Sequence, residues 1–425
     1  MKLTAEQQAI YDGAQGETYA KIMQTLVRYG ELYGAEEMVP ITGEHGHLVT
    51  SFGLKVIHPV YKLMDELIDA GVVSKQTFTM DPRPMDRHVP SNPIRDLVFK
   101  VFMYSEQSKY EEQLKKLGLM SGDGFSCACY FDEQGNKPKK GDVLSWAESS
   151  AVVYANSVLG ARCNRNSGIL ELFGSILGCV PKFGLLTDEG RKATWRVVLK
   201  TSKLPSAQVL GSAIGMKVME DVPYVFGLSE YLGHELTPEV CAYLKNFGAA
   251  TASNGAVGLY HIDGLTPEAV EQGEALIAPN AQTYVIDDAE IRRVIDSYPV
   301  IWKNPDAKPK MCFIGCPHLT RSELLDWIRK ICAALKANGR SKPVIPVVLT
   351  SAPGVLNAIK GSEEERMAAA YGLTVSYICP LMYCDNPLVH SVPIITNSNK
   401  LRTYTSCRFY EDDKILAMIT GGEVK

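Results

Sequence analysis

The chain has 425 residues, more than one hydrophobic core usually serves, so two or three lobes are expected. Its hydrophobic content of 46% and charged content of 22% are typical of globular proteins, and its net charge of −4 argues against a nucleic-acid partner. No apolar run approaches the roughly 20 residues that span a bilayer, so no membrane partner is expected.

The chemistry of the cysteines depends on the compartment. The first residues, MKLTAEQQAIYDG, indicate a charged helix and not a signal peptide, which predicts a cytoplasmic protein. The eleven cysteines should then be reduced, as core residues, nucleophiles or metal ligands. The sequence has no CxxC pair, no GxxxxGK[ST] loop, no strand–GxGxxG–helix unit and no GxSxG elbow, which disfavours the sites those motifs build.

The first part of the chain predicts helices with short strands between them. A capping box at Thr4 and Gln7 opens a helical region. In the segment Gly43–His47, glycines expose His45 and His47 on a loop. The run SCACYF predicts a strand with Cys127 and Cys129 on one face. Helices are expected at 4–34, 63–70, 95–117 and 166–178, and strands at 39–41 and from 77.

The run Trp146–Arg165, WAESSAVVYANSVLGARCNR, is the least ordinary in the chain. It mixes small and apolar residues with Glu148, Asn156 and Arg162. Small residues allow close approach of a ligand, and buried polar groups are costly unless paired. We expect this run to border a site; the alternative is a tightly packed core helix whose polar groups satisfy loop carbonyls.

The rest of the chain predicts two further α/β regions. A strand at 195–200, short strands with glycine turns over 210–232 and a helix at 237–246 indicate a separate lobe. From residue 308 strands and helices alternate, with strands at 311–314, 344–350 and 373–378 and helices after 320 and at 363–371. This alternation predicts a doubly wound parallel sheet, in which ligands bind beyond the carboxyl ends of strands. Cys316 and Cys379 both follow such strand ends.

Three well-separated cysteines beside loops, Cys127, Cys316 and Cys379, could converge on iron and leave one coordination position open. The alternative is that they are small core residues, as we expect for Cys163, Cys179, Cys241, Cys312, Cys332, Cys384 and Cys407. Two other hypotheses remain: a zinc site from Cys127, Cys129 and His318, or a metal-free scaffold or regulatory subunit.

Several motifs together resemble the aconitase X family of hydro-lyases over nearly the whole chain. They are YGAE at Tyr33–Glu36, the loop at His45, the cysteine motif at Cys127, the run Trp146–Arg165, GCPH at Gly315–His318, Cys379, and TNSNK at Thr396–Lys400. Two positions depart from the family pattern. Cys129 stands where proline is usual and Cys163 where threonine is usual, and whether either joins a metal site is open.

The resemblance implies a lyase that removes water from a small hydroxy acid, with mevalonate 5-phosphate or cis-3-hydroxy-L-proline as the substrate types. It implies an aconitase-like α/β fold with three lobes, 1–193, 194–300 and 301–425, around a central cleft. The family's swivelling domain has no room before Lys425, so a small swivelling-domain subunit is the expected partner. The implied cofactor is iron or an iron–sulfur cluster of open nuclearity.

The resemblance also suggests residue roles. Cys127, Cys316 and Cys379 are the expected metal ligands. Asn156, Arg162 and Ser398 are expected to anchor the substrate carboxylate, Lys400 to add positive charge, and His45 or His318 to relay the leaving group's proton. Glu148 is an acid/base candidate or a helix cap, and a serine of the small domain is the expected base. Further substrate-binding candidates are Ser149, Ser150, Arg165 and Asn397; the two arginines could hold a phosphate or one carboxylate.

Overall fold

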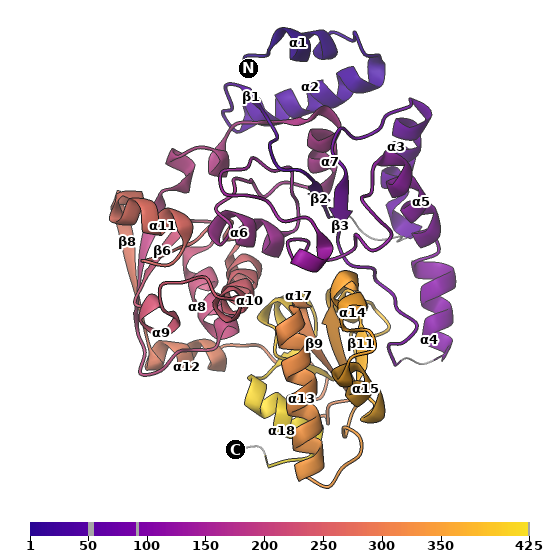
Figure 1. Cartoon of the computed structure of the whole chain (residues 1–425), viewed down its shortest axis with the longest axis vertical. Coiled ribbons are helices and arrows are strands. Elements are labelled where there is room, and N and C mark those ends of the chain that lie inside the picture. Colours follow the sequence, from indigo (N-terminus) through magenta and orange to yellow (C-terminus); the bar gives the residue numbers. More distant parts are fainter. Residues whose placement is uncertain (50–54, 91–92, 424–425) are drawn as a thin grey trace.

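The computed structural model describes residues 1–49, 55–90 and 93–423 and shows an α/β protein (Figure 1). The first segment has more helix than strand and long loops between them, with two small sheets in which β1 pairs antiparallel with β4 and β2 pairs parallel with β3. Its elements are α1 (Ala5–Tyr11), α2 (Glu17–Leu32), β1 (Met38–Pro40), β2 (Gly46–Leu48), η1 (Lys55–Ile57), α3 (His58–Asp69), β3 (Phe78–Met80), α4 (Pro93–Val98), the π-helical η2 (Phe99–Met103), α5 (Gln107–Leu117), η3 (Asp132–Gln134), α6 (Ser149–Ser157), α7 (Gly168–Leu177), β4 (Cys179–Pro181), η4 (Gly184–Leu186) and η5 (Glu189–Arg191).

The second segment contains a four-stranded parallel sheet in the order β7-β6-β5-β8. Helices α8 and α10 pack closely against each other beside this sheet (Figure 1). The elements are β5 (Ala193–Lys200), α8 (Ala207–Val218), β6 (Pro223–Phe226), α9 (Ser229–Leu232), α10 (Pro238–Gly255), β7 (His261–Ile262), α11 (Pro267–Gln272), η6 (Gly273–Leu276), β8 (Ile277–Asp287) and α12 (Asp288–Asp296).

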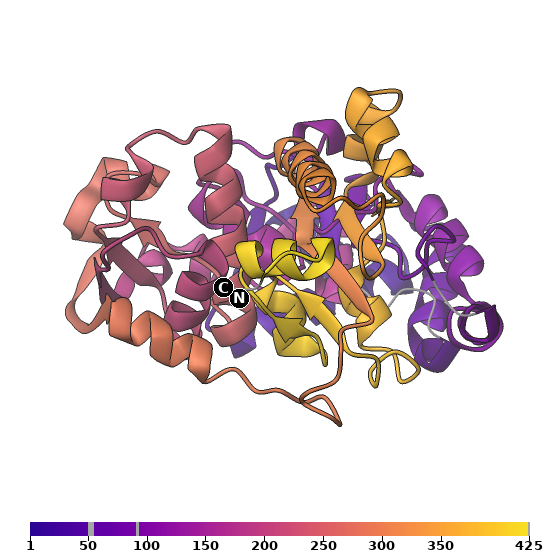
Figure 2. The same ribbon diagram turned by 90° about the horizontal axis from the view of Figure 1, so that it is seen from below.

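The third segment is the doubly wound unit that the sequence predicts. Its five strands are all parallel, in the order β11-β10-β9-β12-β13, and helices lie around the sheet (Figure 2). The elements are β9 (Met311–Leu319), α13 (Arg321–Ala337), β10 (Val347–Ser351), α14 (Pro353–Ile359), α15 (Glu363–Ala370), β11 (Thr374–Ser376), α16 (Pro380–Cys384), β12 (Ile394–Thr396), α17 (Asn399–Tyr404), β13 (Arg408–Phe409) and α18 (Asp412–Thr420).

Local signals explain several helix boundaries. Thr4 and Gln7 form the expected capping box of α1, and Thr320 forms another with Glu323 at the start of α13. Ser167 caps α7, which ends at Gly178 in the left-handed conformation. None of the helices in the described ranges has the length and apolar character needed to cross a lipid bilayer.

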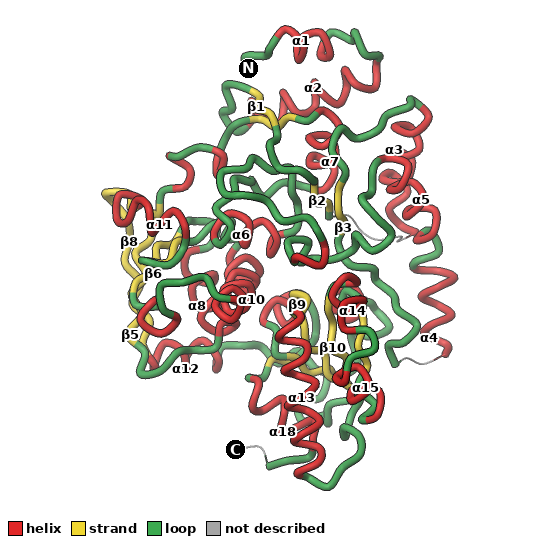
Figure 3. The backbone as a smooth tube through the Cα atoms, viewed as in Figure 1, coloured by secondary structure: helices red, strands yellow, loops and turns green. Residues whose placement is uncertain are grey.

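Three local predictions were wrong, and Figure 3 shows how much of the first segment is loop. Residues 127–130 form a turn, so Cys127 and Cys129 do not share a strand face. Residues 207–218, where short strands were expected from 210, form helix α8. Its small residues let the backbone of α10 approach closely: a Cβ added at Gly211 would lie 2.3 Å from the carbonyl oxygen of Phe247. The expected helix at 95–117 is interrupted between η2 and α5.

Candidate active site

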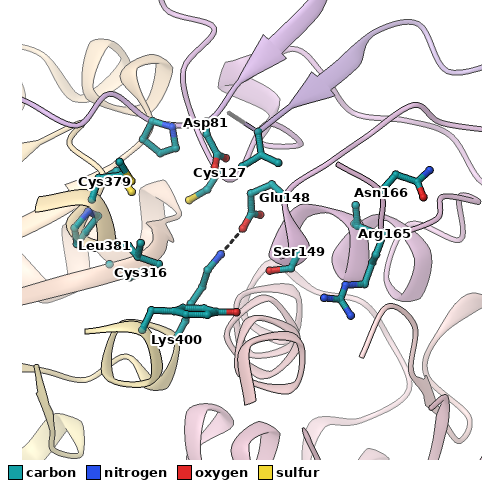
Figure 4. Close-up of a pocket in the computed structure, with 17 residues that line it drawn as sticks. Asp81, Cys127, Glu148, Ser149, Arg165, Asn166, Cys316, Cys379, Leu381 and Lys400 are labelled. Carbon is teal, nitrogen blue, oxygen red and sulfur yellow. Dashed lines mark hydrogen bonds and ion pairs between the residues drawn. The ribbon is translucent and has the colours of Figure 1, made fainter. Parts of the chain in front are cut away.

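A cavity of about 430 Å³ lies where the first and third segments meet, and Figure 4 shows its lining. The described residues that line it come from both segments: Val49, Asp81, Pro82, Cys127, Glu148, Ser149, Val152, Arg165, Asn166, Gly315, Cys316, Cys379, Pro380, Leu381, Met382, Lys400 and Tyr404. The three cysteines lie on one side and Arg165 and Asn166 on the opposite side, with Glu148 and Lys400 between them.

Three separate parts of the chain bring the cysteines to this cavity. Cys127 lies in the turn after Phe125, and its sulfur accepts a hydrogen bond from the backbone N–H of His318 at 3.5 Å. Cys316 lies inside β9, the central strand of the third sheet, because β9 continues to Leu319; the prediction that it follows the strand end was wrong. Cys379 is the residue directly before α16, as predicted beyond a strand end. The topology therefore assembles residues that are 189 and 63 positions apart in sequence.

The surroundings of these thiols suit metal ligands better than free nucleophiles. Burial raises the pKa of Cys316 to about 11 and raises the pKa values of Cys127 and Cys379 above their ordinary range. A free thiol there stays protonated at neutral pH, whereas a bound metal deprotonates its cysteine ligands. Three thiols that line one cavity have the chemistry of iron–sulfur ligands. They are spaced more widely than ligands of a single ion, because within the described ranges no three His, Cys, Asp or Glu residues lie close enough together to hold a metal ion.

A buried ion pair joins the two segments across the middle of the cavity. Lys400 Nζ, on α17, donates to Glu148 Oε1 and, at 3.1 Å, to Ser150 Oγ. Burial alone would raise the pKa of Glu148, but the Lys400 ammonium outweighs it and holds that pKa below its usual value. Burial opposes the charge on Lys400, and Glu148 reverses this and raises the pKa of Lys400. Both groups are therefore charged at neutral pH.

Glu148 also begins helix α6. Its Oε2 accepts hydrogen bonds from Ser150 Oγ at 2.6 Å and from the N–H of Ala151 at 2.7 Å, and its backbone has a φ of 81°. A positive φ is uncommon for a residue with a side chain and marks a backbone position that the surroundings enforce. This turn places Ser149 in the cavity lining and confirms the prediction that Trp146–Arg165 borders a pocket.

At the far side of the cavity, Arg165 supplies a solvent-accessible guanidinium. It donates a hydrogen bond to the carbonyl of Ala256, the residue after α10. Its side chain lies against Gly258, where an added Cβ would approach the Arg165 Cδ to 3.0 Å. The cavity thus has a thiol side and a cationic side.

Both predicted relay histidines lie outside the lining. His45 faces Thr77, 2.7 Å from its Nδ1, in a separate small pocket. His318 is fully buried, with Nδ1 3.2 Å from Ser126 Oγ and Nε2 3.2 Å from the carbonyl of Ile378. Burial lowers the pKa of His318 to about 4, so its ring is neutral. Because both ring nitrogens have protein partners, neither the proton relay nor the zinc hypothesis is supported by this geometry.

Three other residues that were predicted to bind the substrate make hydrogen bonds within the protein instead. Arg162 pairs with Asp188 at 2.5 Å and with the carbonyl of Leu186. The Asn156 amide bridges Cys163 and Gly258 and accepts from Arg191. Asn397 donates to Asp412 at 2.8 Å.

Ser398 and the two unusual cysteines also have structural contacts. Ser398 caps α17 and donates to the carbonyl of Cys316, so it ties the helix of Lys400 to the strand of Cys316. Cys129 is buried beside His47, and the Cys163 sulfur lies 3.4 Å from the carbonyl of Trp146. Neither cysteine belongs to the described lining of the cavity.

Asp81, a buried carboxyl group in the lining, was not among the residues predicted from the sequence. It follows β3, and its Oδ1 has no hydrogen-bond partner within the described structure, although His47 Nε2 lies 3.7 Å away. Burial raises the pKa of Asp81. Its place directly after a predicted strand, at the start of a proline-stiffened loop, was the available signal.

Comparison with known proteins shows which family the sequence resembles. The model of the aconitase X first domain matches residues 1–189, and that of the second domain matches residues 193–296. The phosphomevalonate dehydratase large subunit of Thermococcus kodakarensis is 33% identical, over 84% of this chain and 82% of that protein. The cis-3-hydroxy-L-proline dehydratase of Pseudomonas aeruginosa is 26% identical, over 95% of this chain and 66% of that protein.

The fold agrees as well. The crystal structure of Thermococcus kodakaraensis aconitase X in its holo form superposes with a TM-score of 0.80 and 28% identity, covering 100% of both chains. The α/β architecture and the sequence motifs therefore both indicate the same family. The chain belongs to the aconitase X family.

Proposed function

We propose that this chain is the large, catalytic subunit of a hydro-lyase that dehydrates mevalonate 5-phosphate. Relatives with 33% identity are named phosphomevalonate dehydratase large subunits, and a relative with 26% identity is named cis-3-hydroxy-L-proline dehydratase. The observation that carries the proposal is the two-sided cavity, with three cysteines facing a cationic side across a buried ion pair. A substrate with a hydroxy acid at one end and a phosphate at the other has matching chemistry.

Cys127, Cys316 and Cys379 would hold the iron–sulfur group that the family implies. When bound, such a group supplies a Lewis acid for the hydroxyl that leaves. The chain's own residues supply the electrostatics. The Lys400 ammonium is a fixed positive charge that binds the substrate carboxylate, and Glu148 keeps it charged and in place. Ser149 offers a hydroxyl in the lining for substrate orientation.

Proton removal from the carbon next to the carboxylate needs a base within hydrogen-bond reach. Glu148 is engaged by Lys400, Ser150 and Ala151, so it is a poor candidate. We assign this step to a residue of the small swivelling subunit. The name "large subunit" of the relatives supports such a partner, and so does the longer Pseudomonas aeruginosa dehydratase, of which this chain covers 66%.

The cationic side favours a phosphate-bearing substrate over the second candidate, cis-3-hydroxy-L-proline. The smaller amino acid carries one carboxylate and could be held at the Lys400 centre alone. A phosphate at the far end gives Arg165 a partner in a charge-assisted hydrogen bond. cis-3-Hydroxy-L-proline remains the second candidate because a relative with 26% identity is named cis-3-hydroxy-L-proline dehydratase.

The test is co-expression of the chain with the small-subunit protein from the same genome, followed by dehydration assays on both hydroxy acids under anaerobic conditions. Arg165→Met should raise KM for mevalonate 5-phosphate about tenfold, because a solvent-accessible charged hydrogen bond is lost. Arg162→Met is the matched control, since Arg162 pairs with Asp188 outside the cavity, and it should leave KM nearly unchanged. Turnover of hydroxyproline alone, or equal effects of the two variants, would contradict the proposal.

A further inference from the structure

We propose that Asn399 is a positioning residue: it fastens α17 to the second segment and so fixes the place of Lys400 in the cavity. Asn399 is not among the described residues that line the cavity, so it acts through its neighbour. The part of this inference that concerns substrate binding rests on the proposed function, in which the Lys400 ammonium binds the substrate carboxylate. The attachment itself stands on hydrogen bonds alone.

Asn399 is the first residue of α17, and it is fully buried. Its backbone N–H donates to Gln208 Oε1 at 2.8 Å, and its Nδ2 donates to the Gln208 carbonyl at 2.8 Å. Nδ2 also donates to Tyr298 Oη at 3.1 Å. Both protons of the amide group therefore have partners in the second segment, which leaves none for a bond within α17.

Helix α17 depends on such contacts because it has only six residues. Isolated helices shorter than about 12–15 residues are marginal in water, so tertiary contacts set the orientation of this one. Ser398, which caps α17, donates to the carbonyl of Cys316 in the third segment. Asn399 binds the second segment, and Lys400 Nζ donates to Glu148 in the first. Three consecutive residues thus tie the start of α17 to all three segments.

Arg402, in the same turn of α17, strengthens the attachment. Its Nε donates to Asn399 Oδ1 at 2.7 Å, and its guanidinium also donates to Asn254 Oδ1, on α10, at 2.6 Å. The centre of the guanidinium group lies 4.1 Å from the ring centre of Tyr298. Helices α17 and α10 accordingly lie side by side (Figure 1). Contacts with the second segment therefore hold the whole first turn, in which Lys400 lies.

The consequence is a cation whose place is set from outside the cavity. The Lys400 ammonium has to meet Glu148 Oε1 and Ser150 Oγ, which belong to the first segment, so a shift of α17 separates it from both. A displacement of about 1 Å in an active site can lower a rate about a hundredfold. Loss of the Asn399 contacts should therefore weaken the cavity through Lys400.

The first test needs neither turnover nor substrate. Competitive labelling of the full chain with acetic anhydride, read by mass spectrometry, measures the reactivity of each lysine, and an ammonium held in an ion pair reacts slowly. Asn399→Ala should raise the labelling rate of Lys400 about tenfold, as expected when one or two hydrogen bonds are lost. Lys245 is the internal control: it lies on α10, its side chain is 1% exposed, and it pairs with Glu323 at 2.7 Å.

Lys245 separates a local effect from a general one. A variant that merely loosens the fold raises the labelling of both buried lysines, whereas loss of the attachment raises that of Lys400 alone. Unchanged labelling of Lys400 in Asn399→Ala, or an equal rise at Lys245, would overturn the proposal.

Two variants of Gln208 test the same attachment from the other side, and they also serve if Asn399→Ala does not fold. Gln208→Leu removes the oxygen that accepts from the Asn399 N–H, whereas Gln208→Glu keeps it. Gln208→Leu should raise the labelling rate of Lys400 about threefold, as expected for one hydrogen bond, and Gln208→Glu should stay near the wild-type rate. Equal effects of the two variants would contradict a role for this hydrogen bond.

Substrate binding connects the attachment to the proposed function. The Kd of the two-subunit complex for mevalonate 5-phosphate, measured by calorimetry, should rise about tenfold in Asn399→Ala. The double variant Asn399→Ala/Lys400→Met should bind no more weakly than Lys400→Met, because a residue that acts through Lys400 has no effect without it. Additive losses would overturn the positioning role. If the labelling results hold but the wild-type complex does not bind mevalonate 5-phosphate, the proposed function fails in its substrate, while the attachment of Lys400 by Asn399 stands.

Discussion

Replacing Lys400 by methionine tests the ion pair at the centre of the cavity. The change keeps the aliphatic length of the side chain and leaves Glu148 buried without its cation; the side chains of Lys400 and Glu148 are 9% and 5% exposed. Removing one partner of a buried pair typically destabilises a protein by about 3–5 kcal/mol. Glu148 keeps its hydrogen bonds from Ser150 and Ala151, so we expect the lower end, about 3 kcal/mol.

Urea unfolding of the isolated chain measures this loss, and the double variant Lys400→Met/Glu148→Gln provides the internal check. Removing both charges should recover most of the stability, since no unpaired charge remains. Activity of the two-subunit enzyme should stay lost in both variants. Lys414→Met is the control, because Lys414 is exposed and its loss should change stability by less than about 0.5 kcal/mol. A loss below about 1 kcal/mol in Lys400→Met, or a double variant no more stable than the single one, would refute the reasoning.

Two further predictions concern buried titratable groups. Because burial raises the pKa of Glu171 from 4.5 to about 8, folding stability from this group is complete below pH 4.5 and is lost as pH rises toward 8, by up to about 1.4 kcal/mol per pH unit. Urea unfolding at pH 5 and pH 8 should therefore show a smaller loss in Glu171→Gln than in the wild-type chain; parallel losses would contradict this. His318→Ala should destabilise the chain by about 1–3 kcal/mol, since Ser126 and the Ile378 carbonyl lose a buried partner. The pH profile of kcat in that variant should keep its shape. If one of the pH-dependent slopes of that profile disappears, His318 does relay a proton and this account of it is wrong.

The sequence predicted the parts of the site that depend on long motifs. The run Trp146–Arg165 borders the cavity, and Cys127, Cys316 and Cys379 all line it. The parallel sheet of the third segment followed from the alternation of strands and helices, which correctly placed Cys379 beyond a strand end, whereas Cys316 lies inside β9 and not beyond it. These features are local or follow from topology, so spacing and resemblance were sufficient.

The remaining errors concern which way a side chain points. Arg162 and Arg165 are three residues apart in a segment that lies outside α6, so helical periodicity could not tell that only Arg165 joins the lining. His318 follows Cys316 by two residues, yet its ring is held by Ser126, which is 192 positions away. Asp81 and Glu171 owe their properties to burial by distant segments, which the sequence does not display.

The most direct test of the central claim is the iron and acid-labile sulfide content of the anaerobically purified wild-type chain beside two single variants. Cys316→Ser removes a thiol of the cavity, and Cys332→Ser removes a buried thiol on α13 as the matched control. We predict iron and sulfide in the wild-type protein and in Cys332→Ser, and their loss in Cys316→Ser. Full iron content in Cys316→Ser, or a wild-type chain without iron, would contradict the account.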